Sequence, residues 1–247
     1  MRWRVLIGPV VLLVFWWAIT AAGLVRPIFL PPPGQVFSSL AALFTDGPLW
    51  TDMSATLYRT GVAFVAAAIV GLIIGVPLGI SGKLYESLEV VFDFFRSMPS
   101  PALVPLAMLL FGLGNLSRIS VAAFTCSLVN AIQVAYAVRQ IPRHRVVAGK
   151  LAGAKGLFLL TRILVPSVLP GVVAGWRITL SLALIIIVVT EMFIGTRSGL
   201  GMRIYDFHLM FRSADMYAAI LVVGIMGYVL NKAIEIAERR FVHWAGK

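Results

Sequence analysis

Residues 60–82 read TGVAFVAAAIVGLIIGVPLGISG, and this stretch contains no Asp, Glu, Lys or Arg. A bilayer core of about 30 Å is crossed by roughly 20 residues of α-helix, because a helix satisfies its own backbone hydrogen bonds. The stretch therefore predicts a transmembrane helix. Within it, Gly71, Gly75 and Gly79 recur every four residues, and this spacing predicts a seam of small residues for close packing against another helix.

The composition of the whole chain extends this prediction. Among its 247 residues, 60% are apolar and only 13% are charged, and the mean hydropathy is +0.95. Soluble domains contain roughly 45 to 50% apolar and about 25% charged residues. Too few polar residues remain to cover a second, water-facing globule, so we expect residues 1–247 to form a single membrane-embedded domain.

Five further apolar segments accompany the opening stretch, so the predicted fold is all-α with six transmembrane helices. Three of these segments also lack Asp, Glu, Lys and Arg, whereas the longest one is interrupted by Arg177 and closed by Glu191. The first is longer than the roughly 7 to 15 residues of a signal-peptide core, so we expect it to stay in the protein, with cleavage as the alternative. The six predicted helices cover residues 5–25, 60–82, 97–117, 119–138, 163–193 and 216–234.

The positions of the cations predict the orientation of the chain. Lys and Arg together outnumber Asp and Glu by 21 to 10, which gives a net charge of +11. Most of these cations flank the apolar segments on the side of the two termini, and cations stay preferentially on the cytoplasmic side of a membrane. Both termini are therefore expected in the cytoplasm. Since the cations do not form a stripe on one face, no nucleic-acid partner is expected.

The residue types that metal centres and enzymes use are sparse. Cys126 is the single cysteine, so the chain has no internal disulfide and no cysteine-based metal site. His144, His208 and His243 are far apart in sequence, and neither an HExxH nor a GxSxG motif occurs. We therefore predict no metal site, no resident cofactor and no catalytic residue.

The longest basic connection between predicted helices covers residues 139–162 and is expected to be cytoplasmic. Its glycines, among them Gly153, each cost a helix about 1 kcal/mol relative to alanine, so we expect them to serve a bend or a close backbone approach. Composition alone leaves two interpretations open, an interfacial element on anionic lipid or a docking element for another protein. Apolar residues recur at helical spacing and predict short amphipathic helices: Val147, Leu151, Ala154 and Phe158.

Residues 147–170 read VAGKLAGAKGLFLLTRILVPSVLP. This pattern resembles the EAA loop in permease subunits of binding-protein-dependent ABC importers, where Glu-Ala-Ala, three residues and a Gly are followed by a Pro thirteen residues after that Gly. Gly153 and Pro166 have this spacing. Val147 stands where the family usually has Glu, and Gly149 replaces the second Ala, so a salt bridge from that Glu to the ATPase is not implied for this chain.

Further motifs resemble the branch of this family that imports nitrate, sulfonates, taurine or bicarbonate, and they occur in the same order. The resemblance implies the fold of a type I ABC importer permease, a location in the inner membrane of a bacterium, and a small anion as the solute. The motifs are LPPP at residues 30–33, RSMPSPALVPL at 96–106, FGLG at 111–114, GWRI at 175–178, EM at 191–192, GLG at 199–201, and ERR at 238–240 followed by Trp244.

The resemblance also implies partners. In that family two permease subunits form a transmembrane dimer, two ATPase subunits bind ATP and Mg²⁺, and a periplasmic or lipid-anchored binding protein delivers the solute. This chain has no Walker A sequence, so it is not expected to bind ATP or to be an enzyme. Residues 139–162 are implied to couple it to the ATPase, with a bend at Gly153 and contacts from Lys150 and Phe158. The coupling residues are Ala148, Lys150, Gly153, Phe158 and Pro166.

Two charged residues in the fifth predicted helix require an explanation, because a charge near the bilayer centre costs at least about 2.5 to 3.5 kcal/mol. Arg177 and Glu191 are fourteen residues apart, so they return to nearly the same helix face but lie about 21 Å apart along the axis. In one interpretation they line the translocation pathway, where Arg177 attracts an anion and Glu191 belongs to the outer gate. In the other, each pairs with a neighbouring helix.

Four more residues are candidates for the translocation pathway: Pro101, Pro105, Asn130 and Gln133. Proline removes a backbone donor, so the third predicted helix is expected to be broken, which suits either a cavity lining or a simple packing kink. Asn130 and Gln133 lie about one turn apart in the fourth predicted helix. They either face the pathway or hydrogen-bond to other helices.

The predicted function is the transmembrane permease subunit of an ATP-driven importer. The alternative is an ion-coupled secondary transporter or a channel, since both also need several helices with polar groups inside. The spacing of Gly153 and Pro166 favours the importer, because a self-contained carrier has no need of a loop shaped for another subunit.

Overall fold

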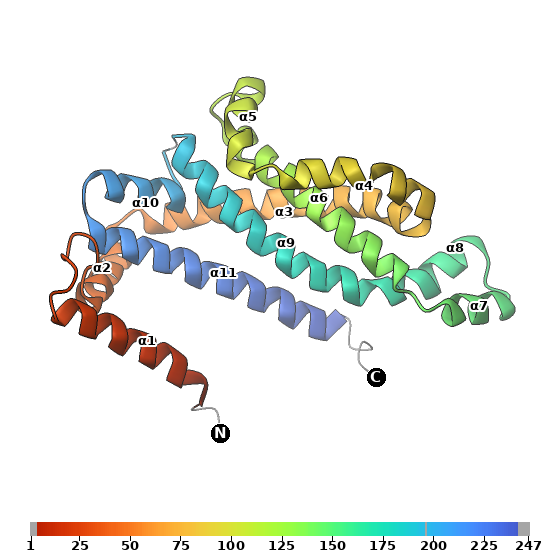
Figure 1. Ribbon diagram of the computed structural model, residues 1–247, viewed down its shortest axis with the longest axis horizontal. Coiled ribbons are helices and arrows are strands. Elements are labelled where there is room, and N and C mark those ends of the chain that lie inside the picture. The colour runs from red at the N-terminus through yellow and green to blue at the C-terminus, as the bar shows by residue number, and fades with distance from the viewer. Residues whose placement is uncertain (1–3, 196, 242–247) are drawn as a thin grey trace. The chain divides into compact units, whose positions relative to one another are not determined.

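The computed structural model describes residues 4–195 and 197–241, and these residues form helices joined by turns, with no strand among them (Figure 1). The prediction of an all-α fold is therefore confirmed. Two short elements, the 3₁₀-helix η1 (Ser100–Leu103) and the π-helix η2 (Leu160–Leu164), interrupt the series of α-helices. The α-helices are α1 Arg4–Ala21, α2 Pro33–Asp46, α3 Leu49–Ile80, α4 Gly82–Ser97, α5 Val104–Phe111, α6 Asn115–Arg139, α7 Arg143–Leu151, α8 Gly156–Leu159, α9 Val165–Phe193, α10 Leu200–Leu209 and α11 Ser213–Phe241.

Among the described residues, 4 helices are long and apolar enough to cross a membrane alone. They are α3, α6, the continuous helix Thr161–Phe193 that contains α9, and α11. The pair formed by α4 and the helical segment Ser100–Phe111 passes the same test together, although it is bent by 88°. The described apolar part of α1, Ile7–Ala21, is shorter than these helices. Each of the six predicted segments overlaps a helix, but the described residues contain four candidate spans, or five if the bent pair counts as one, where six were predicted.

The predicted bounds of the third segment, residues 97–117, are corrected by the structure, because a turn at residues 112–114 divides the segment and residues 115–117 already belong to α6. Pro101 lies in the first turn of η1, and Pro105 lies in the first turn of α5. Proline is tolerated in a first turn because the missing N–H has no helical acceptor there, so each proline marks a new start. A turn at Gly112, with φ 72°, separates α5 from α6. The expected break at the prolines is confirmed.

The chain packs as two compact units, which we describe separately. One contains residues 1–56 and 195–226, and the other contains residues 57–194 and 227–247. Both α3 and α11 run from one unit into the other. The assignment of residues 1–247 to a single domain stays a prediction.

In the first unit, polar side chains of α3 hold the start of α10. The Asp52 carboxylate accepts a hydrogen bond from the Gly199 N–H at 2.9 Å, and the Thr56 hydroxyl accepts one from the Leu200 N–H at 2.9 Å. Asp52 also pairs with Arg203 at 2.6 Å. A carboxylate at a helix N-terminus satisfies free N–H groups and interacts favourably with the helix dipole, so these contacts fix α10 against α3.

In the second unit, α3 and α9 both approach α6 closely through glycine. A Cβ atom added at Gly75 would lie 2.5 Å from the carbonyl oxygen of Ala131 on α6, and one added at Gly79 would lie 2.4 Å from the Cβ of Val138. On α9, a Cβ added at Gly175 would lie 2.5 Å from Oε1 of Gln133. The predicted small-residue seam is confirmed, because no larger side chain fits at these crossings.

Candidate functional site

The predicted coupling loop, residues 139–162, emerges at one end of the side-by-side helices α6 and α9 (Figure 1). It contains α7 and α8, so the predicted short helices are confirmed. Gly153 has φ 84° and Gly156 has φ 51°, both in the left-handed region that disfavours other residues. The bend between α7 and α8 therefore depends on these two glycines, as expected for Gly153.

Apolar side chains project from this loop without cover from the described residues. Val147 is 53% exposed, Leu151 is 84% exposed and Phe158 is 61% exposed. Ala154, the fourth member of the predicted stripe, is buried. We call Val147, Leu151 and Phe158 the apolar row of the loop. Among the predicted coupling residues, Ala148, Lys150, Gly153 and Phe158 are exposed and Pro166 is partly buried, while their contact with an ATPase stays a prediction.

Gly149 explains one departure from the EAA pattern. It is buried, and a Cβ atom added there would lie 2.1 Å from the Cδ1 atom of Ile163. The alanine that the pattern has at this position would require Ile163 to move. The glycine therefore allows α7 to pack closely on the segment that leads into α9.

A buried ionic cluster joins α3, α6 and α9. Arg59 is 3% exposed and its Nη1 atom lies 2.5 Å from Oε1 of Glu191, which is 0% exposed. The Nε–H of Arg59 donates to Oδ1 of Asn115 at 2.9 Å, and Arg118 donates to the carbonyl oxygen of Ile194 at 2.5 Å. We call Arg59, Asn115, Arg118 and Glu191 the Glu191 cluster.

Sequence reasoning singled out Glu191 but missed its arginine partners. Arg59 directly precedes the charge-free residues 60–82, and Arg118 lies between two charge-free segments. Arg59 thus stands at the start of a predicted helix and Arg118 in a one-residue connection between two, positions at which cations usually reach water. One signal could have pointed to them, because a Glu buried in the membrane needs a cation close to its carboxylate.

Arg177 has a different environment on the same helix. Its guanidinium lies 3.9 Å from a carboxylate oxygen of Glu235 and 3.8 Å from one of Glu238, both on α11, and 41% of its side chain is exposed. It lines an open groove of about 580 Å³, and Asn231 donates to the Ser181 hydroxyl at 2.6 Å in the same groove. We call this feature the Arg177 groove.

Sequence analysis left two interpretations of Arg177 and Glu191, a lining of the translocation pathway or a pairing with a neighbouring helix. The structure decides between them only in part. Arg177 and Glu191 each pair with a neighbouring helix, as the second interpretation expected. Asn130 is 0% exposed and donates to the carbonyl oxygens of Ala67 and Ala68 on α3, so it also bridges helices. A role of these residues in a translocation pathway stays a prediction.

The remaining pathway candidates are not gathered around Arg177. Gln133 is partly buried, and its side-chain oxygen accepts a hydrogen bond from Thr179 on α9 at 3.5 Å. Pro101 and Pro105 are exposed and begin short helices. The structure therefore distributes the predicted pathway residues over several helix contacts instead of forming one site.

No group of His, Cys, Asp and Glu in the described part of the chain has the geometry of a metal site. Cys126 is buried within the helix packing. His243 and Trp244 lie outside the described residues.

Comparisons with known proteins support the fold and the family. A family model described as "Binding-protein-dependent transport system inner membrane component" matches residues 67–245. The taurine transport system permease protein TauC of Escherichia coli is 29% identical over 242 residues, which cover 96% of this chain and 88% of that protein. The nitrate import permease protein NrtB of Synechocystis is 31% identical over 219 residues, which cover 85% of this chain and 79% of that protein.

Two further comparisons agree. The putative aliphatic sulfonates transport permease protein SsuC of Bacillus subtilis is 25% identical over 239 residues, which cover 97% of this chain and 86% of that protein. A chain of the MetNI methionine ABC transporter in an inward-facing conformation superposes with a TM-score of 0.64 and 22% identity, covering 81% of this chain and 98% of that chain. The predicted fold and family are confirmed. This chain belongs to the family of inner membrane components of binding-protein-dependent transport systems.

Proposed function

We propose that two copies of this chain form the translocation path of an ATP-driven importer for a small anion of the nitrate, sulfonate, taurine or bicarbonate type. Relatives named for taurine, aliphatic sulfonates and nitrate align with most of the chain. The observation that carries the proposal is the exposed apolar row on a loop that is continuous with two membrane helices. Two ATPase subunits and a binding protein that delivers the solute complete the importer.

The coupling loop suits a protein partner for two reasons. Exposed apolar side chains on a segment outside the bilayer lose contact with water only when another molecule covers them. The apolar row also sits in a segment, residues 139–162, that contains basic residues and no Asp or Glu. An apolar groove with an acidic rim on the ATPase fits this surface, with Lys150 at its edge and Phe158 inside it.

The loop connects to α6 at one end and to α9 at the other. Closure of two ATPase subunits on ATP would displace the docked loops. Rigid helices transmit such a displacement, because packed helices shift as units. Alternating access then follows from movement of α6 and α9 in the two copies.

The Arg177 groove is our candidate for the anion passage. Charge-assisted hydrogen bonds have lengths of about 2.7 to 2.9 Å, whereas both carboxylates near Arg177 lie at 3.8 Å or more. The guanidinium of Arg177 donates no hydrogen bond to any residue that the structure describes. Its N–H groups are therefore available to a passing anion. Exposure of 41% of the side chain gives that anion access.

The orientation belongs to the proposal. We place residues 139–162 and both termini in the cytoplasm, following the distribution of Lys and Arg. A reporter fused after Lys247 is expected to be active only in the cytoplasm. Activity of the same fusion in the periplasm would contradict both the orientation and the docking of the loop.

The direct test is transport by a reconstituted complex. The chain is purified in complex with its ATPase and its binding protein, and uptake of labelled nitrate, taurine, ethanesulfonate and bicarbonate into vesicles is measured with and without ATP. We expect uptake of at least one of these solutes only with ATP and the binding protein. Uptake driven by an ion gradient through this chain alone would establish the alternative, a secondary transporter.

The coupling loop has its own test. Leu151→Glu places a charge in the apolar row and is expected to abolish copurification of the ATPase. Lys155→Ala, at an exposed position of the same loop outside the row, is the control and is expected to leave the complex intact. Equal copurification with both variants would show that the row does not dock the ATPase.

A further inference from the structure

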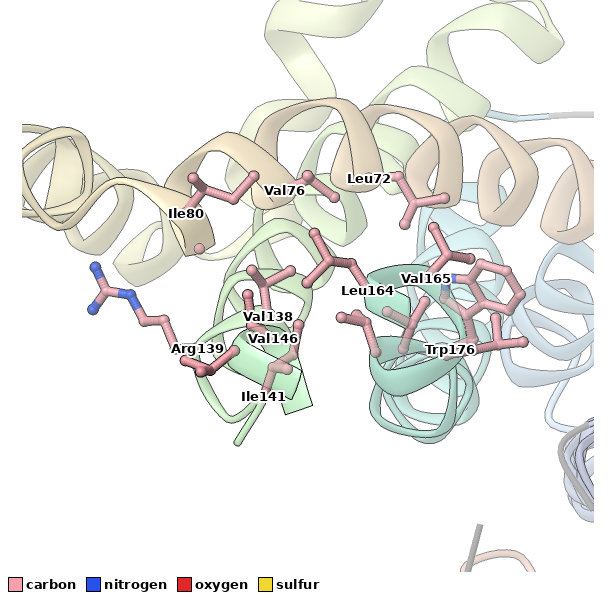
Figure 2. Close-up of a pocket in the computed structure, with 15 residues that line it drawn as sticks. Leu72, Val76, Ile80, Val138, Arg139, Ile141, Val146, Leu164, Val165 and Trp176 are labelled. Carbon is pink, nitrogen blue, oxygen red and sulfur yellow. The ribbon is translucent and has the colours of Figure 1, made fainter. Parts of the chain in front are cut away.

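An apolar cavity of about 760 Å³ lies next to the coupling loop in the second unit (Figure 2). Its walls come from α3, α6, α7 and α9, and include Leu72, Val138, Val147, Val165 and Trp176. Ligand pockets in proteins commonly measure about 300 to 1,000 Å³ and are mostly apolar with a few polar groups. This cavity therefore has the size and lining of a binding site for an apolar ligand.

The cavity is elongated. Leu72, Val76 and Ile80 form one row along α3 (Figure 2) and span about 12 Å of helix axis. Along the α9 side, the lining extends from Leu164 to Trp176, about 18 Å of helix axis. An elongated apolar space of this kind suits a single extended hydrocarbon chain.

One end of the cavity carries a positive charge. Arg139, the last residue of α6, is the single charged residue in the lining, and its guanidinium points away from the apolar walls (Figure 2). The guanidinium carbon lies 3.9 Å from the centre of the Tyr85 ring, a cation–π contact that holds it at the rim. Residues 139–162 that follow contain further cations and no Asp or Glu, so the rim favours an anionic head group.

We propose that this cavity binds one acyl chain of an anionic phospholipid, with the phosphate of the head group beside Arg139. In the predicted orientation, Ile80 and Arg139 end their helices at the cytoplasmic face, so the cavity runs from that interface into the bilayer. Basic sites between membrane helices on the cytoplasmic side attract anionic lipids. Burial of the chain against the apolar walls supplies the remaining affinity.

A lipid bound in this cavity would contact the coupling loop. Val146 and Val147 of α7 and Leu164 at the start of the long helix all contribute to its walls. A bound chain would therefore fill the space between the coupling loop and α3. This consequence rests on the proposed function, whereas the binding site itself does not.

The test uses Trp176 as the probe. In a single-tryptophan variant, with Phe at the other five positions, the full chain is reconstituted in phosphatidylcholine vesicles that contain small amounts of phosphatidylglycerol with brominated acyl chains. Bromine quenches tryptophan fluorescence on contact. We expect brominated phosphatidylglycerol to quench Trp176 at about fivefold lower mole fraction than brominated phosphatidylcholine, equivalent to about 1 kcal/mol for one cation at the interface.

Three further variants make the result specific. A variant that retains only Trp17, which is 62% exposed, should show equal quenching by the two lipids. Arg139→Gln should remove the preference at Trp176 while quenching by brominated phosphatidylcholine remains. Val76→Phe, which narrows the cavity, should reduce quenching by both lipids.

Equal quenching of Trp176 and Trp17 by both lipids would overturn the proposal, since it would show only bulk lipid. Protection of Trp176 from both lipids would also overturn it and would indicate that a second copy or another protein segment fills the cavity. The quenching of Trp176 and of Trp17 is measured without ATP. If selective quenching of Trp176 were intact but the uptake assay failed, the proposed function would be overturned and the lipid site would remain supported.

Discussion

Glu191 is fully enclosed near the C-terminal end of α9 and lies 2.5 Å from Arg59, whereas Arg177, about four turns earlier on the same helix, keeps 41% of its side chain exposed. The carboxylates nearest to Arg177 lie 3.8 and 3.9 Å away. A buried charge with short contacts has no lower-energy alternative, because separation would leave it without solvent. A half-exposed charge with long contacts can exchange partners at little cost.

The comparison teaches that two charges on one membrane helix need not share a role. The Glu191 cluster is built as a permanent connection between α3, α6 and α9. The Arg177 groove leaves its guanidinium half-exposed with long contacts, as our proposal of a passing anion requires. The following predictions test this contrast, beginning with the largest expected effect.

Glu191→Gln is expected to destabilise the protein by about 3 to 5 kcal/mol, because it removes the carboxylate from a buried cluster that contains two arginines. Unfolding of the purified protein in detergent and denaturant measures the loss. The control is Glu238→Gln beside Arg177, which is expected to cost less than about 1 kcal/mol. Similar losses in the two variants would remove the distinction between the sites.

Replacing both members of the buried pair tests whether the loss of stability comes from leaving one charge unpaired. Arg59→Met with Glu191→Leu removes both charges of that pair, and we expect the double variant to be more stable than Glu191→Gln, in which two buried arginines lose their carboxylate. If the double variant were as unstable as Glu191→Gln, the other contacts of the Glu191 cluster would contribute to stability beyond the ion pair itself.

Arg177→Gln is expected to leave stability nearly unchanged but to raise the KM for the transported anion about tenfold or more, because hydrogen bonds to charged groups contribute about 1.5 to 3 kcal/mol. Concentration-dependent uptake in vesicles measures the KM. Arg177→Lys keeps the charge and should recover part of the affinity. An unchanged KM in Arg177→Gln would reduce Arg177 to a link between α9 and α11.

The smallest expected effect concerns the electrostatic potential inside the Arg177 groove. Cys126 is the only cysteine, so Cys126→Ala provides a cysteine-free background for Ile178→Cys, whose side chain lines the groove. An anionic methanethiosulfonate should react there faster than a cationic one. Arg177→Gln should lower that ratio about fivefold, in line with about 1 kcal/mol for one nearby charge.

Salt sharpens this measurement. The Debye length falls from about 10 Å at 0.1 M to about 3 Å at 1 M, so the ratio of the two reaction rates should fall with ionic strength. The stability difference between Glu191→Gln and the original protein should depend little on salt, since buried pairs are screened much less. No reaction with either reagent would indicate that lipid, not water, fills the groove.

Several features could be predicted from the sequence because they depend on local pattern. The charge-free residues 60–82 specify a long apolar helix, and Gly153 specifies a bend, since only glycine adopts φ 84° without strain. Pro101 and Pro105 indicated a broken helix. The predicted end of the segment 97–117 at residue 117 was wrong, because freedom from charge does not show that the backbone turns at Gly112.

Local sequence patterns could not predict which residues the buried polar side chains contact. Arg59 and Glu191 are 132 residues apart in sequence, and no periodicity joins them. Asn130 was consistent with a pathway or a helix contact, and only the approach of α3 at Gly71 shows that it is enclosed. The apolar cavity beside Arg139 likewise depends on the spacing of four helices.

The sequence by itself determined an all-helical membrane protein, the positions of its apolar segments and the loop pattern that identifies its family, because hydropathy and backbone preference act within a few helical turns. The tertiary structure alone decided which charges are enclosed, which face a groove and where the helices leave a cavity. Those outcomes depend on distances between segments that are remote in the chain, and a buried charge is stabilised only by the group that packing places beside it.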